Sequence, residues 1–161
     1  MDIRLDETDV KILDILQKEG RITTKALADR LKLTPTPVYE RMKRLEKEKI
    51  IDKYVALLNP KKIDIKLSVF IFISLKNHTR SYLESFIEEM NKFDEVAECY
   101  HVAGGFDFFL KVLIKDMEAY EAFLLTKLSV NTNIAHVQSS FVLSRSKYST
   151  ALKVKATPRK K

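Results

Sequence analysis

The spacing of apolar positions in the first fifty residues predicts three short helices. These positions recur three or four residues apart, as on one face of a helix, at Ile12, Leu13, Leu16, Leu27, Ala28, Leu31, Val38, Met42 and Leu45. A residue type that caps helices precedes each group: Asp6, Thr23 and Thr34. The connection between the second and third groups, Lys32-Leu33, is very short. Three helices with so tight a turn are typical of a helix-turn-helix.

From residue 67 onward the pattern alternates between strands and amphipathic helices. Strand-like runs lie at 67–75, 96–103, 106–114 and 134–143. Helical patterns lie between them, at 83–90 and 117–128. The order βαββαβ predicts a ferredoxin-like domain. The pair Gly104-Gly105 predicts a two-residue hairpin in which both glycines have positive φ.

The sequence therefore predicts an α+β fold in four parts. These are a winged-type helix-turn-helix of three helices at 1–52, a strand and linker at 53–66, the ferredoxin-like domain at 67–145 and a basic tail at 146–161. Around the first boundary, residues 51–58 are a strand candidate that a turn at 59–62 closes.

Both helices of a βαββαβ domain are expected to cover the same face of its sheet. The other face then exposes Phe70 and Phe72, or the opposite set. Exposed aromatic strand faces typically mark an interface, so we expect two sheets to pack face to face in a homodimer. Such a dimer would present two recognition helices to a pseudo-palindromic DNA site.

Composition and charge narrow the classes of function. The chain carries 29 basic and 22 acidic side chains, a net charge of +7. Residues 21–53 hold ten basic and five acidic groups, and residues 145–161 hold seven basic groups and no acidic one. A basic segment over a helix-turn-helix pattern favours double-stranded DNA as the partner. We expect the tail itself to be a frayed, solubilising end.

The same inventory excludes several other classes. Cys99 is the single cysteine, which rules out an intramolecular disulfide and a cysteine-based zinc site and favours a reducing cytoplasm. His78, His101 and His136 lack metal-ligand spacing, although the strands that carry the last two could lie near each other. The longest strongly apolar run has nine residues, against about 20 for a membrane helix. We expect no enzyme activity, metal, cofactor or membrane partner.

The third predicted helix carries the candidate DNA contacts. With its apolar stripe turned inward, its outer face offers hydroxyl, ring and carboxylate groups that can read base edges, followed by basic groups that suit phosphates. An ordinary solvated helix of mixed charge is the alternative interpretation. Together with the threonines at helix starts, the candidate DNA-binding residues are Thr23, Thr34, Thr36, Pro37, Tyr39, Glu40, Arg41, Lys43, Arg44 and Lys47.

Several segments of this first region form a recognisable pattern: 5–9, 12–13, 16–17, 21–23, 27–28, 33–41 and 45–46. With them the region resembles the Lrp/AsnC regulators, the leucine-responsive or feast/famine family. Lys32 and Lys49 depart from the family pattern, in which glycine is common at both places.

The resemblance continues through the second half of the chain, at 102–108, 137–143 and 149–152. It implies an ACT-like domain, called the RAM domain, that senses an amino acid. It also implies effector sites where dimers meet, between the hairpin loop and the segment that enters the last strand. Dimers of the family assemble further, commonly to octamers.

An amino acid presents one ammonium and one carboxylate, and the chain offers groups for both. Asp107 could accept from the ammonium, and backbone N–H groups beside small residues could hold the carboxylate. The glycines could instead form a plain hairpin turn, and Asp107 could be a turn carboxylate bonded to nearby backbone. The candidate effector-binding residues are Gly104, Gly105, Asp107, Thr132, Asn133, Gln138, Ser139 and Ser140.

The sequence thus predicts a cytoplasmic, sequence-specific DNA-binding transcription regulator whose assembly and DNA binding respond to an amino-acid-type effector. Two alternatives stay open. One is an architectural protein that wraps DNA without an effector, for which weak sequence preference and a steep salt dependence would speak. The other is a ferredoxin-like small-molecule-binding protein without a DNA function.

Overall fold

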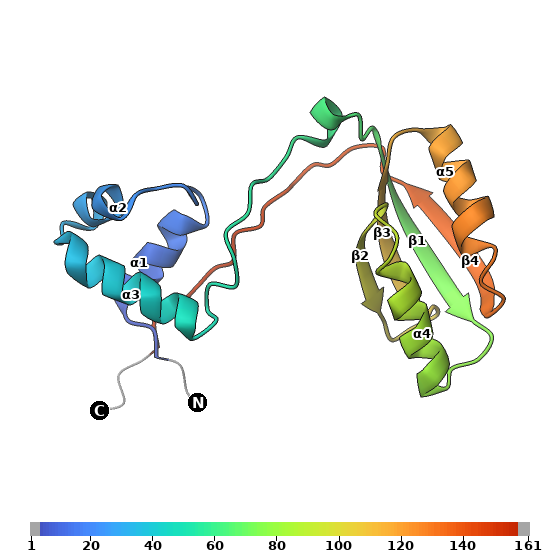
Figure 1. The fold of residues 1–161 in the computed structure, drawn as a ribbon, viewed down its shortest axis with the longest axis horizontal. Coiled ribbons are helices and arrows are strands. Elements are labelled where there is room, and N and C mark those ends of the chain that lie inside the picture. Colours follow the sequence, from blue (N-terminus) through green and yellow to red (C-terminus); the bar gives the residue numbers. More distant parts are fainter. Residues whose placement is uncertain (1–3, 158–161) are drawn as a thin grey trace. The chain divides into compact units, whose positions relative to one another are not determined.

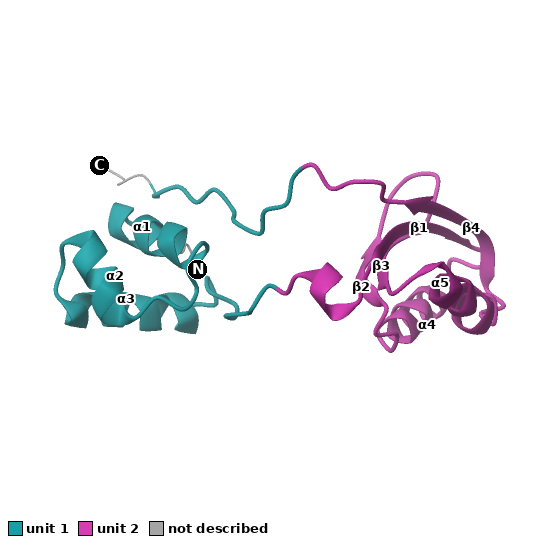
Figure 2. Cartoon of the chain, turned by 90° about the horizontal axis from the view of Figure 1, so that it is seen from above, with its two compact units in different colours: residues 1–57, 147–161 teal, residues 58–146 magenta. Residues whose placement is uncertain are grey.

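The computed structural model describes residues 4–157. The chain folds into two compact units (Figures 1 and 2). The first unit consists of Met1–Leu57 together with Lys147–Lys161, and the second unit is Leu58–Ser146. The chain therefore leaves the first unit once, forms the second and returns. Residues 147–157 of the tail, which was predicted as a separate frayed end, belong to the same unit as the three N-terminal helices.

The first unit is the predicted set of three helices: α1 (Glu7–Leu16), α2 (Thr24–Leu31) and α3 (Pro35–Lys47). Asp6 and Asp9 form the expected capping box, and the Thr23 hydroxyl accepts from the Ala26 N–H at 3.2 Å. Thr34 occupies the N-cap position of α3, but its side chain makes no capping hydrogen bond. Side chains from all three helices fill the core, where Ile12, Leu27, Ala28, Val38 and Leu45 are fully buried.

The C-terminal segment 152–157 is bound along this unit as a strap. Gln17 and Leu152 exchange two hydrogen bonds, of 3.0 and 2.6 Å, between the side-chain amide and the backbone. Leu5 and Thr157 exchange two more, of 2.8 and 3.2 Å. Val154, between them, is half-buried against the helical core. The expectation of a frayed end is therefore wrong for residues 152–157, while 158–161 lie outside the described residues.

Val154→Ala is expected to lower the free energy of unfolding of the first unit by about 1 kcal/mol, because methyl groups that are partly removed from water are lost. Leu152→Ala is the matched control on the same strap, since the Leu152 side chain is 75% exposed and should cost little. Urea unfolding followed by helix circular dichroism measures both. Equal costs for the two variants would show that the Val154 side chain does not pack on the core.

Two lysines of the first unit have left-handed backbone conformations. Lys32, at the end of α2, has φ 56°, and Lys49, just after α3, has φ 58°. Both are the positions where the sequence departs from the glycine that is common in the family. The turns form nonetheless, because hydrogen bonds such as Leu33 N–H to Ala28 O (3.0 Å) and Ile50 N–H to Leu45 O (2.9 Å) close them.

Lys49→Gly is therefore expected to stabilise the protein by about 1 kcal/mol, because an L side chain strains the left-handed region and glycine does not. Lys11→Gly, the same exchange at an exposed position within α1, should cost about 1 kcal/mol instead. Thermal unfolding distinguishes the two signs. A melting temperature that falls in both variants would contradict the argument.

The second unit is the predicted βαββαβ domain. Its sheet has the order β2-β3-β1-β4 and every neighbouring pair is antiparallel. Helix α5 continues into a π-helical turn, η2 (Leu124–Leu128), and a short 3₁₀ helix, η1 (Pro60–Ile63), precedes the sheet. The other elements are β1 (Leu67–Leu75), α4 (Arg80–Met90), β2 (Val96–His101), β3 (Phe108–Ile114), α5 (Met117–Phe123) and β4 (Ile134–Phe141).

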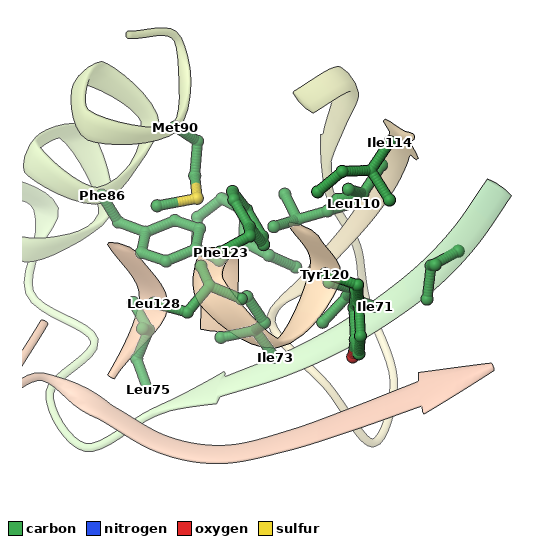
Figure 3. Packing of buried hydrophobic residues seen from close by; sticks show 13 residues of the cluster. Ile71, Ile73, Leu75, Phe86, Met90, Leu110, Ile114, Tyr120, Phe123 and Leu128 are labelled. Atoms are coloured by element: carbon green, nitrogen blue, oxygen red, sulfur yellow. The ribbon is translucent and has the colours of Figure 1, made fainter. Parts of the chain in front are cut away.

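Both long helices cover one face of the sheet, as expected (Figure 2). Alternate residues of β1, from Val69 to Leu75, point into the core, where they meet Phe86 and Met90 of α4 and Phe123 of α5 (Figure 3). The sheet face turned away from the helices is called the open face below. It carries Phe70 and Phe72, one of the two sets of residues that the alternation of β1 left open.

Two local predictions are wrong. Residues 51–58 do not form a strand, because no strand of the described chain pairs with them. The two glycines do not form a two-residue hairpin. Six residues, 102–107, separate β2 from β3, and a backbone hydrogen bond from Val102 to Asp107 (2.9 Å) closes the loop. Gly104 has φ +153° and Gly105 does not have positive φ.

Candidate DNA-binding helix and effector site

The outer face of α3 carries most of the predicted DNA contacts. Val38 and Leu45 are fully buried, which turns the other side of the helix to solvent. The Tyr39 side chain is 48% exposed, and the Lys43 Nζ lies 5.7 Å from the centre of its ring. Predicted DNA-binding residues that are exposed on the first unit are Thr23, Thr34, Thr36, Pro37, Tyr39, Glu40, Lys43, Arg44 and Lys47.

Arg41 and Arg44 have partners that the sequence pattern did not reveal. Arg41 Nη1 donates to Asp6 Oδ2 at 2.6 Å and to Asp9 Oδ1 at 2.7 Å, and Arg44 Nη2 donates to Asp9 Oδ2 at 2.5 Å. The two aspartates stand at the start of α1, so these ion pairs hold α3 to α1. The arginine side chains remain 31% and 42% exposed.

The ion pairs also shift the pKa values of Asp6 and Arg41. Burial raises the pKa of the Asp6 carboxyl, but the Asp9 N–H and the Arg41 guanidinium outweigh burial and hold that pKa below its ordinary value of 3.8. Partial burial lowers the pKa of Arg41, and the two aspartates more than compensate, so its pKa is raised. The Asp6 contribution to stability is therefore complete above its ordinary pKa and is lost as the pH falls through the lower folded value.

One end of the sheet brings together the loops predicted to bind an effector. There the loop 102–107, the residues after β1 and the segment before β4 meet, because Ile73 pairs with Phe108 and Leu75 with Ile134. Asp107 is largely buried. Its Oδ2 accepts from the Leu75 N–H at 2.7 Å and lies 3.0 Å from His78 Nε2. Asp107 therefore bonds to backbone, as the turn-carboxylate interpretation expected, but the donor is on strand β1 and not in its own loop.

Residues 131–133 are also fastened at this end. The Asn77 N–H donates to Asn133 Oδ1 at 3.0 Å, the Asn133 amide donates to Asn77 O at 3.2 Å, and Lys76 Nζ donates to Thr132 O at 2.7 Å. A surface cavity of about 260 Å³ opens beside them. Its lining consists of Tyr82, Ser85, Phe86, Val130, Asn131, Thr132 and Asn133.

The remaining candidate effector residues lie apart from this cluster. Ser139 belongs to the helix side of β4, where it accepts a hydrogen bond from the Tyr120 hydroxyl. Gln138 and Ser140 pair with Phe72 and Phe70 on the open face. Sequence reasoning missed His78 and Asn77, because nothing in a linear pattern shows that the segment after β1 reaches Asp107 and Asn133.

The positions of the histidines correct one expectation. His101 and His136 are on the two edge strands β2 and β4, with β3 and β1 between them, so the idea that these strands could lie near each other is wrong. Residues 4–157 contain no group of three or more potential metal ligands. Among the helices of these residues, none is sufficiently long and apolar to span a bilayer.

Comparison with known proteins identifies both units. Residues 5–52 match the winged helix-turn-helix DNA-binding family, and residues 68–152 match the Lrp/AsnC ligand binding domain. The chain is 38% identical over 151 residues to the leucine-responsive regulatory protein of Escherichia coli, covering 94% of this chain and 92% of the relative. It is 36% identical over 154 residues to the transcriptional regulator AzlB of Bacillus subtilis, covering 96% and 98%.

Solved structures agree. A transcriptional regulator from Neisseria meningitidis, crystallised as its L-Met complex, matches with TM-score 0.88 and 37% identity over 92% of this chain and 96% of its own. An AsnC family regulator from Agrobacterium tumefaciens matches with TM-score 0.87 and 35% identity over the same shares. The relatives are regulators, which confirms that the chain is not an enzyme. It belongs to the Lrp/AsnC family of DNA-binding transcription regulators with a ligand-binding domain.

Proposed function

We propose that this regulator binds a specific DNA sequence as a symmetric assembly, and that an amino acid bound at the Asp107 end of the sheet changes both the assembly and the DNA affinity. The observation that carries the proposal is the fixed carboxylate of Asp107 among three loops that bring backbone groups together. The L-Met bound by the Neisseria relative supports an amino acid as the ligand class. Because its partner is DNA, we place the protein in the cytoplasm.

The open face supports the proposed dimer. Phe109 stands at its centre, with ring centroids 5.1 Å from Phe70, 5.2 Å from Phe72 and 6.0 Å from Tyr100. These rings are half-buried or exposed in the single chain. A second copy of the same face would bury them, as expected of an isologous interface.

The Asp107 end supplies complementary groups for the two charges of an amino acid. The Asp107 carboxylate can accept from the ammonium, and backbone N–H groups around Gly104-Gly105 and at Thr132 can donate to the ligand carboxylate. An ammonium ligand competes with His78, which lies 3.0 Å from the same oxygen. An ammonium bound at this oxygen replaces His78 as the partner of Asp107.

Linkage gives the mechanism. If the amino acid binds one assembly state more tightly than another, it shifts the population toward that state, and the spacing of the helix-turn-helix units changes with it. By reciprocity, DNA that prefers the same state raises the affinity for the amino acid by the same factor. Octamers fit this scheme, because each added dimer brings two more recognition helices.

The experiment uses a fluorescent duplex that the wild-type protein selects from a random-sequence pool. Its affinity is measured without ligand and with each of the twenty amino acids. We expect one or a few to change the dissociation constant about five- to 150-fold, the usual range of allosteric coupling. Failure of the pool to converge on a sequence, with a steep salt dependence, would support the architectural alternative instead.

A further inference from the structure

Asp9 is the one charged or polar residue in the buried core of residues 4–157, and it has two arginine partners on another helix. Its side chain is 1% exposed. Each of its oxygens accepts from a different guanidinium: Oδ1 from Arg41 at 2.7 Å and Oδ2 from Arg44 at 2.5 Å. One carboxylate at the start of α1 thereby fixes two side chains of the recognition helix α3.

The bonds to the aspartates use one nitrogen of each guanidinium, Nη1 of Arg41 and Nη2 of Arg44. A guanidinium has five N–H donors in a rigid plane, so both groups have further donors. Their exposure, 31% and 42%, means that solvent reaches part of each side chain. Held on the inner side by Asp9, such a group has lost most of its conformational freedom before it meets a phosphate.

We propose that Asp9 is a positioning residue for DNA binding. It orients Arg41 and Arg44 so that their remaining N–H donors meet two phosphates of the duplex. The proposal rests on the assignment of both arginines as phosphate contacts, and it adds a buried residue of α1 that does not itself touch DNA. It also explains why the arginines have partners within the chain and still belong to the DNA interface.

For Asp9→Asn, an effect of net charge alone and a loss of arginine positioning change the DNA affinity in opposite directions. The exchange removes a negative charge from a protein that binds a polyanion, so charge alone would tighten DNA binding. Positioning predicts at least a tenfold weaker affinity and a shallower dependence of affinity on salt. Each phosphate contact contributes about 0.9 to the logarithmic salt slope, so the loss of both contacts flattens it by about 1.8.

Glu19→Gln is the matched control. Glu19 makes a two-bond ion pair with Arg30, at 2.6 and 2.7 Å, in the same unit, and both side chains are about half exposed. The carboxylate-to-amide exchange and the charge change are identical. Because Arg30 is not a candidate DNA contact, we expect unchanged or slightly tighter binding and an unchanged salt slope.

The full-length variants are compared on the selected duplex without amino acid, after circular dichroism has established that each is folded at the assay temperature. A folded Asp9→Asn protein that binds as tightly as wild type, with the same slope, would overturn the proposal. This outcome is independent of any effector response, because no amino acid is present in the titration.

Arg44→Lys keeps the test decisive if Asp9→Asn does not fold. A lysine retains the charge but cannot satisfy Asp9 and a phosphate with one rigid plane. We expect about tenfold weaker DNA binding, while Arg30→Lys, the same exchange at the arginine that pairs with Glu19, should bind like wild type. Wild-type affinity of Arg44→Lys would overturn the proposal.

Discussion

Replacing Phe72 and Phe109 together by glutamate is expected to make the protein monomeric. Both rings belong to the open face and pack on each other at 5.2 Å, outside the core that the helices cover. Two glutamates on each copy would place like charges together in a face-to-face dimer and would have to be desolvated there. Because the rings lie outside the core, the domain itself should still fold.

The effect on DNA binding is expected to be large. A dimer engages two half-sites at once, and the second contact is intramolecular, which raises affinity by a factor on the order of 10² to 10⁴. The monomeric variant should lose about this factor on the selected duplex. Sedimentation velocity at micromolar concentration measures the mass, and Leu125→Glu is the control, since Leu125 is 62% exposed in η2 on the helix side. A variant that still sediments as wild type would contradict the open-face dimer.

Asp107→Asn is expected to abolish the response to the amino acid. The amide removes the charge that would pair with the ligand ammonium in a largely buried site, where an unpaired ammonium is costly. We expect at least a 100-fold weaker ligand affinity by calorimetry. Asparagine still offers an oxygen to the Leu75 N–H, so the loop should keep its fold.

Two comparisons make this result specific. DNA affinity without ligand should match wild type, because Asp107 is in the second unit and the candidate DNA contacts are in the first. Asp64→Asn is the control exchange, at an exposed aspartate of the same unit that pairs with Lys66 at 2.7 Å. An Asp107→Asn protein with wild-type ligand affinity would show that this carboxylate serves the turn alone.

Periodic patterns predicted helices and strands well where the neighbouring strands and helices belong to the same domain. The strand at 67–75 was predicted to the residue, because both of its neighbours and its helices are in the same domain. The capping box at Asp6 is local and was also found. Residues 51–58 have a strand-like composition but no strand beside them, and composition alone cannot supply one.

Contacts between distant segments could not be predicted in this way. The strap bonds Gln17 to Leu152, and the ion pairs of α3 join Asp9 to Arg41 and Arg44. From the sequence, Arg44 is an outward position of a basic helix and Arg41 lies on its flank, which is correct but incomplete. The clustering of Asp107 with His78 also depends on the sheet register. Such contacts can be predicted only once the topology of the fold is known.

If an amino acid controls the assembly of this regulator, the molar mass of the protein alone depends on that ligand. Size exclusion with light scattering measures the mass without ligand and with each of the twenty amino acids. We expect one or a few of them to change the molar mass, between multiples of a dimer, and the same ones to change DNA affinity. If none changes the molar mass, an amino acid does not control the assembly.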